Sequence, residues 1–246
     1  MGFSLGAALA VTLFGGVASG IAGFGFALIC VPLLLQIYPP QTVVAISILL
    51  SLLTGWIILP GVWRQIRVAT VAALIPWAIL GVFAGVALLR ILDVAQIKLV
   101  ASLVVAGFAL SMLRGWSPPG TDSPLATVVA GAASGTLNAL TGVAGPPVVM
   151  LFVARNLDTH AFRTSIVAYF VLIDVAALAI LVRVGEIGWT ETRSALVLLP
   201  AAIVGTFVGR HLVSRVPVET FRRLVLIMVM STGALGVVDA LRTLVS

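Results

Sequence analysis

Long apolar stretches alternate with short polar ones along the whole chain. A membrane-spanning helix needs about 20 apolar residues, and eight stretches approach or exceed this length. They cover roughly residues 3–37, 41–63, 68–90, 94–114, 125–154, 161–184, 195–213 and 221–243. The ten-residue alternating pieces that are typical of transmembrane barrel strands are absent. The pattern therefore predicts a bundle of about eight hydrophobic helical segments.

Composition agrees with an all-α integral membrane protein. Hydrophobic residues make up 61% of the chain and charged residues 9%, and the first charged residue is Arg64. Such a chain has too little polar surface to cover a water-soluble globule. The net charge of +6 comes from lysines and arginines scattered at segment ends, as topology signals are, which argues against nucleic acid as a partner. One cysteine and two histidines without clustered acids predict no metal site, and no cofactor is expected.

The chain repeats itself. Shifting the sequence by 115 positions aligns "GVASGIAGFGFALICVP" (16–32) with "GAASGTLNALTGVAGPP" (131–147). Shifting it by 124 positions aligns 76–100 with 200–224, with a proline and two glycines in register. Two matches in the same order indicate a duplication. The predicted units are therefore a first transmembrane repeat (1–114), a polar linker (115–124) and a second repeat (125–246).

The first segment of each repeat, 3–37 and 125–154, has glycine, serine and proline near its centre. Unwound backbone inside a bilayer is tolerated only where it is enclosed by protein or lines a wet cavity. Broken segments at corresponding positions of two repeats are typical of a transport site. If both enter and leave the membrane on one face, the lysines and arginines divide more unequally between the faces, which favours inverted repeats.

Half-helix N-termini carry unpaired N–H donors and partial positive charge, which suits an anion. Neither break contains a carboxylate, so a cation cage fits poorly there. In the second break, Pro146 and Pro147 stand where a new helix would begin, and residues 142–145 could present amides. The candidate substrate-binding residues are Ser19, Gly20, Gly23, Gly25, Ser134, Gly135, Asn138, Thr141, Gly142 and Gly145.

Two charged residues near the second break are further candidates. Arg163 stands at the start of the sixth segment, where its guanidinium could hold an oxyanion or serve as an ordinary interfacial charge. Asp174 lies near the centre of the same segment. A mid-membrane acid is costly and usually functional, so Asp174 is the candidate for proton coupling. The alternative is a protonated or arginine-paired aspartate that holds the bundle together.

Through the paired "GxxSGxxxxxxGxxxxP"-type breaks, "NALTGVAGPP" and the "LGVFAG" and "VGTFVG" helices, the chain resembles the TauE/SafE family of sulfite-exporter-like permeases over about residues 4–240. The resemblance implies two repeats, a bacterial inner membrane and transport of small sulfur-containing anions such as sulfite or organosulfonates. Phe24 and Phe26 depart from the consecutive glycines that are common in the family's breaks.

The function that follows is a secondary transporter for a small anion, working by alternating access. Its partners would be the substrate, the lipid bilayer and a coupling proton, and a homo-oligomer is compatible with the sequence. An anion channel would use the same parts without alternation. A membrane-embedded enzyme is the third hypothesis, and the absence of a plausible nucleophile and base pair argues against it.

Overall fold

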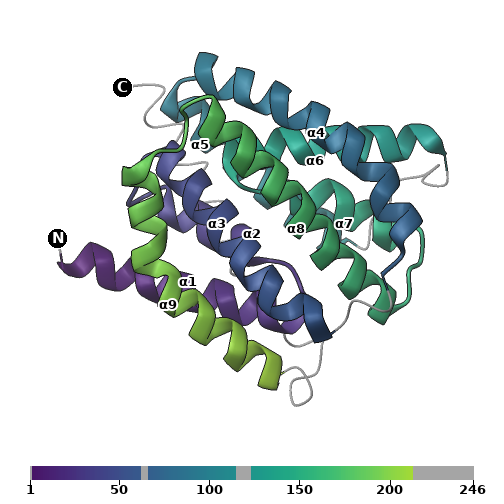
Figure 1. The fold of residues 1–246 in the computed structure, drawn as a ribbon, viewed down its shortest axis with the longest axis horizontal. Helices are drawn as coiled ribbons and strands as arrows, with labels where there is room; N and C mark the ends of the chain where they lie inside the picture. The colour runs from purple at the N-terminus through teal and green to yellow at the C-terminus, as the bar shows by residue number, and fades with distance from the viewer. Residues whose placement is uncertain (1, 62–65, 115–122, 213–246) are drawn as a thin grey trace.

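The computed structural model describes residues 2–61, 66–114 and 123–212, and every regular element within them is helical (Figure 1). This confirms the all-α class. The elements are α1 (Gly2–Ala22), α2 (Phe26–Leu34), α3 (Pro40–Ile58), the short 3₁₀ helix η1 (Leu59–Gly61), α4 (Val68–Ile91), α5 (Val94–Leu113), α6 (Pro124–Thr141), α7 (Gly145–Ala154), α8 (Thr159–Arg183) and α9 (Trp189–Leu212).

Six of these helices are long and apolar enough to cross a membrane, namely α1, α3, α4, α5, α8 and α9. The expectation of eight segments is met only in part. The segment expected over 125–154 consists of the shorter helices α6 and α7, neither of which is among the six. The segment expected over 221–243 and most of the linker 115–124 lie outside the described residues.

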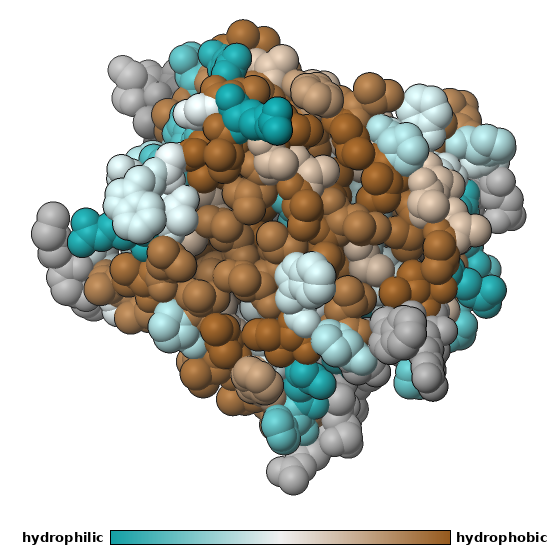
Figure 2. Space-filling model, viewed as in Figure 1, coloured by the Kyte–Doolittle hydropathy of each residue, from teal (hydrophilic) through white to brown (hydrophobic). Residues whose placement is uncertain are grey.

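The surface of the molecule is that of a membrane protein. Figure 2 shows apolar residues across the middle of one face and hydrophilic residues mainly toward its rim. Large apolar side chains such as Leu80, Phe83 and Leu103 are more than half exposed. In water these side chains would form a strongly unfavourable apolar surface, whereas lipid solvates them.

Both predicted breaks are present, and glycine makes each of them possible. The chain leaves α1 through Gly23 and Gly25, whose φ angles are 80° and 103°, and it leaves α6 through Gly142, whose φ angle is 77°. Side chains rarely adopt these left-handed conformations, which glycine tolerates. The helix that follows the second break begins with Gly145, Pro146 and Pro147, and proline is well suited to a first helical turn.

The other glycines of the first segment lie inside α1 and pack against α9. Gly16 faces the carbonyl oxygen of Ala202, 2.6 Å from where a Cβ atom would stand, and Gly20 faces the carbonyl oxygen of Thr206. From α9, Gly205 in turn faces Leu13. Successive α1 positions meet successive α9 positions, so the two helices run in the same direction. Small residues allow this close backbone approach where lipid removes the hydrophobic drive for association.

A matching contact joins α4 to α6. Gly81 faces the carbonyl oxygen of Ala132, and Gly135 faces that of Ala78. These two helices also run in the same direction. The first helix of each predicted repeat thus packs along a helix of the other, α1 along α9 and α6 along α4, so the two halves interlock.

The helices α3 and α8 pack against each other at the centre of the bundle (Figure 1). Ile46, Ile48 and Leu50 of α3 and Ile166 and Ile173 of α8 are fully buried. A helix that is apolar on all sides is buried by its neighbours or by lipid, and α3 contains no charged residue. The two breaks approach each other beside this central pair.

Candidate functional site

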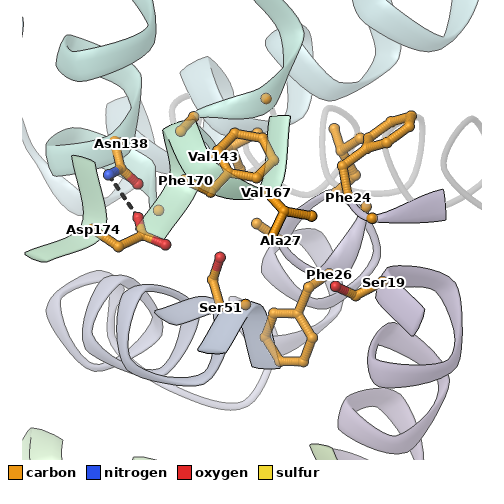
Figure 3. A pocket seen from close by; sticks show the side chains of 17 residues that line it. Ser19, Phe24, Phe26, Ala27, Ser51, Asn138, Val143, Val167, Phe170 and Asp174 are labelled. Carbon is orange, nitrogen blue, oxygen red and sulfur yellow. Dashed lines mark hydrogen bonds between the residues drawn. The ribbon is translucent and has the colours of Figure 1, made fainter. Parts of the chain in front are cut away.

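A small cavity lies where the two breaks meet (Figure 3). Its lining comes from the first break and the start of α2, from residues 142–145 of the second break, and from residues of α1, α3, α6 and α8. The cavity volume is about 30 Å³, which is room for roughly two water molecules. The site is therefore small in this structure.

Two helix N-termini face this cavity. The first residues of α2, Phe26, Ala27 and Leu28, line it, and their amides precede the first intrahelical bond, which Ile29 makes to the Gly25 carbonyl. Orphan amides at a helix start carry partial positive charge and bind anions. The N-terminus of α7 lies opposite, through Ala144 and Gly145.

The second break offers fewer free amides than the sequence suggested. The Gly142 N–H is bonded to the Asn138 carbonyl at 2.8 Å, and the Val143 N–H to the Thr141 hydroxyl at 3.3 Å. Pro146 and Pro147 have no N–H at all. Ala144 and Gly145 are therefore the two amide donors that remain of the expected four.

Ser134 holds the second break in place. Its hydroxyl donates to the carbonyl oxygen of Ala144 at 2.6 Å and accepts a hydrogen bond from the Tyr169 hydroxyl at 2.8 Å. All three residues are buried. Since one donor and one acceptor function of Ser134 are occupied in this way, the structure places this side chain behind the cavity wall as a positioning residue.

Asp174 and Asn138 form a buried polar pair at one side of the cavity. The Asn138 side-chain amide donates to Oδ1 of Asp174 at 2.9 Å. Asp174 is 2% exposed, and its Oδ2 atom has no hydrogen-bond partner. Figure 3 shows the Ser51 hydroxyl of α3 directed toward this carboxyl group. Asp174 is the one charged side chain among the lining residues that the structure describes.

The structure thus gathers most of the predicted residues around one cavity and leaves others beside it. Ser19, Gly23, Gly25, Asn138, Gly142, Gly145 and Asp174 line the cavity. Gly20 and Gly135 face neighbouring helices, and Ser134 and Thr141 hold the second break.

Arg163 also lies beside the cavity. Its Nη2 donates to the carbonyl oxygen of Gly20 at 2.7 Å, and its aliphatic stem packs against Gly23. A cation at the last turn of α1 interacts favourably with the helix dipole. In this structure Arg163 fixes the first break from outside and does not reach the cavity lining.

The contribution of α3 to the cavity was not predicted from the sequence. Ser51 and Gly55 line the cavity, and Ser47 lies one turn earlier against Gly142. These three residues recur every four positions, which places them on one face of a helix. A stripe of small residues at this spacing in an otherwise apolar segment was the available signal.

Comparisons with known proteins match this chain to a transporter family. The family model described as "Sulfite exporter TauE/SafE" matches residues 8–235. A "Probable inner membrane transporter protein TsaS" from Comamonas testosteroni is 26% identical over 70% of this chain and 72% of its own length. A "Probable sulfite/organosulfonate exporter TauE" from Cupriavidus necator is 24% identical over 87% and 86%, respectively. No solved structure matches the chain significantly.

Proposed function

Because the chain belongs to the TauE/SafE sulfite exporter family, we propose that it is a secondary transporter that moves sulfite or an organosulfonate by alternating access. It is a multi-pass inner-membrane transporter and not an enzyme. The similar protein from Cupriavidus necator is named a sulfite/organosulfonate exporter, which supports the substrate class proposed for this chain.

One observation carries the proposal: the N-termini of α2 and α7 face a single buried cavity from opposite repeats. Each brings partial positive charge and orphan amide donors to a place without bulk water. The side chains of Ser19 and Asn138 add polar groups at the same cavity. Such a site favours a compact oxyanion, whose several oxygens accept hydrogen bonds from more than one direction.

We propose that the two repeats are inverted. Because α1 runs with α9 and α4 runs with α6, the hairpin α1–α2 opens toward the end where α9 begins, and the hairpin α6–α7 opens toward the opposite end. Inverted repeats with broken helices that meet at the midplane are common in secondary transporters. The end that carries Arg67, Arg155 and Arg210 would then be cytoplasmic by the positive-inside rule.

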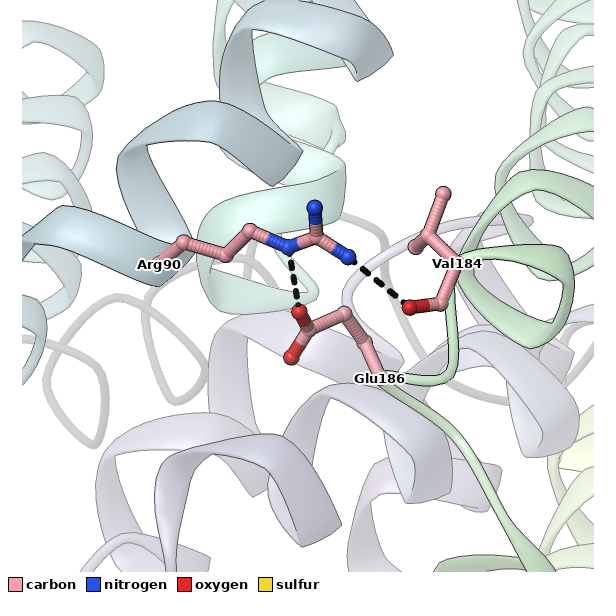
Figure 4. A network of polar contacts seen from close by, with 3 residues as sticks. All are labelled: Arg90, Val184 and Glu186. Atoms are coloured by element: carbon pink, nitrogen blue, oxygen red, sulfur yellow. Dashed lines mark hydrogen bonds and ion pairs between the residues drawn. The ribbon is translucent and has the colours of Figure 1, made fainter.

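Two arginine side chains make contacts near the opposite ends of α9, which is 24 residues or about 36 Å long. At one end, Arg90 of α4 donates to the Val184 carbonyl at 2.8 Å and to Glu186 at 2.7 Å (Figure 4). At the other end, Arg210 donates to the Ile57 carbonyl at 2.8 Å. Arg90 thus ties α4 to the end of α8, and Arg210 ties α9 to α3. We propose that these contacts are latches that open in turn.

The channel hypothesis uses the same residues, but the small cavity between two arginine contacts favours a carrier. A carrier encloses its substrate between two gates, and the small cavity with a latch toward each end fits that scheme. Saturable counterflow of labelled anion would support the carrier, whereas large unitary currents would support a channel.

The test is exchange by purified protein in proteoliposomes. Vesicles loaded with sulfite or methanesulfonate should take up the same labelled anion from outside at a rate that saturates. Vesicles without protein, and vesicles with the Ser19→Leu variant, should show background uptake, because a bulky apolar side chain fills the cavity. Background rates for both anions with the unaltered protein would contradict the proposal.

A further inference from the structure

Resting on the proposed function, we propose that Asp174 is a substrate-site residue: its carboxylate competes with the anion for the field of the two half-helix N-termini, and its protonated form donates a hydrogen bond to the bound anion. The coupling proton and the substrate would thus occupy one cavity. Each anion would bind together with one proton.

The unpartnered oxygen of Asp174 is the first observation. The carboxyl group is 2% exposed, Oδ1 is held by Asn138 at 2.9 Å, and Oδ2 is buried without a hydrogen bond of its own, although the Ser51 hydroxyl is directed toward the carboxyl group (Figure 3). Buried polar atoms are nearly always hydrogen-bonded, so an orphan at a cavity wall indicates that a partner belongs there. A proton on Oδ2 turns this atom into a donor that points toward the space where an oxyanion would lie.

Cavity size makes the two charges exclusive. Because Asp174 lines this small cavity, an anion bound in it would lie only a few ångströms from the carboxyl group. Two unit charges about 4 Å apart at an effective dielectric constant of about 20 weaken joint occupancy on the order of a thousandfold. The anion and the ionised carboxylate therefore exclude each other, whereas the neutral acid and the anion do not.

The neighbouring elements supply no other charge that could take over this role. Among the described residues, α3, α4, α6 and α7 contribute no charged side chain to the cavity lining. On α8, the Tyr169 hydroxyl is committed to Ser134. Arg163 stands eleven residues before Asp174 on α8, about 16 Å along the helix axis, and is bonded to Gly20. A pH response of anion binding would therefore arise at Asp174.

The consequence is a distinctive dependence on pH. Once Asp174 is ionised in the empty site, the apparent affinity for the anion should fall about tenfold for each further unit of pH, because one proton must be taken up for each anion bound. A proton gradient should drive accumulation of the anion in the direction in which protons run.

The experiment compares the unaltered protein with Asp174→Asn in proteoliposomes, using methanesulfonate and sulfite as probes. The variant keeps the position neutral and retains a donor group, so the affinity for the anion should no longer change with pH. Accumulation driven by a pH gradient should fall at least tenfold. The control Asp93→Asn alters an exposed helix-capping aspartate and should leave both activities unchanged.

The outcomes separate the two proposals. Gradient-driven accumulation by Asp174→Asn, or an affinity of the unaltered protein that is flat with pH, would overturn this inference and leave anion transport intact. Failure of the unaltered protein to exchange either anion would overturn the proposed function and this inference with it.

A measurement on the unaltered protein covers the case in which the variant does not fold. Methanesulfonate stays ionised throughout, so a pH-sensitive dye reports protons that the protein takes up when this anion is added in weak buffer. Uptake of about one proton per bound anion supports the inference, and binding without proton uptake refutes it.

Discussion

The side-chain amide of Asn138 donates a 2.9 Å hydrogen bond to Asp174 within the bilayer-spanning part of the bundle. The bond links α6 of the second break to α8 of the central pair, and it directs the second carboxyl oxygen of Asp174 into the cavity (Figure 3). Asn138, which the sequence predicts to bind the anion, and Asp174, which it predicts to carry the proton, therefore form one hydrogen-bonded pair.

Asn138→Leu should abolish transport without preventing insertion into the membrane. The leucine side chain would occupy the cavity, and Asp174 would lose its hydrogen bond in an environment where an unpaired polar atom costs about 1–3 kcal/mol. Exchange rates should drop at least tenfold while the amount of protein in the membrane stays within about twofold. Normal exchange by this variant would remove Asn138 from the site.

Ser134→Ala should be more harmful to stability than Tyr169→Phe. The serine substitution leaves both the Ala144 carbonyl and the Tyr169 hydroxyl without their buried partner, whereas the tyrosine substitution removes one hydroxyl and keeps the bond from Ser134 to Ala144. We expect the free energy of unfolding to fall by about 2–4 kcal/mol for Ser134→Ala and by about 1 kcal/mol for Tyr169→Phe. Thermal unfolding in detergent measures both, and equal melting temperatures would argue against this anchoring role.

Gly135→Ala should destabilise the bundle, and Gly107→Ala should not. A Cβ atom at Gly135 would collide with the carbonyl oxygen of Ala78, whereas nothing lies within 4 Å of a Cβ atom at Gly107. Separating α4 from α6 loses packing along the whole contact. We expect the free energy of unfolding of Gly135→Ala to fall by at least about 2 kcal/mol. Folded yield and melting temperature test the pair. Equal effects would contradict the glycine contact.

Arg90→Ala and Arg210→Ala should open the cavity toward opposite faces. Ser51→Cys in a Cys30→Ala background places a reactive thiol at the cavity, and an impermeant maleimide reports its access from each face. Loss of one latch, worth about 1 kcal/mol, should raise labelling from its own face severalfold. Arg193→Ala, which removes an exposed charge near the start of α9, is the control. Increased labelling from the same face in both latch variants would contradict alternating gates.

Asp158 should make a pH-dependent contribution to stability at the start of α8. Its carboxylate accepts the Ala161 N–H at 2.9 Å, and this bond lowers the pKa of Asp158 below its usual value. A depressed pKa means that the stabilisation is present near neutral pH and is lost as pH falls through the folded-state pKa. Asparagine caps at every pH. Between about pH 6 and about pH 3, melting temperature should therefore fall more for the unaltered protein than for Asp158→Asn, and parallel curves would refute this.

Much of the architecture could be predicted because its causes are local. Gly23 and Gly142 have positive φ angles that glycine tolerates, and Pro146 lies in the first turn of the helix after the second break. Both interruptions can therefore be predicted from the local residue types. The membrane class follows from composition in the same way. The number of full spans was less predictable, because a continuous apolar run such as 125–154 does not show whether it crosses once or folds back as α6 and α7.

The sequence by itself determined that this chain is a membrane protein and where its backbone breaks, since composition and glycine conformation act residue by residue. Tertiary structure alone decided that Gly20 packs on α9 and that the Ser134 hydroxyl donates to the Ala144 carbonyl. It also decided that Asp174 accepts a hydrogen bond from Asn138 and lies near Ser51 (Figure 3). The physical reason is that lipid and protein interior are almost equally apolar. The hydrophobic pattern therefore does not distinguish the helix face that meets a neighbour or a cavity from the face that meets the membrane.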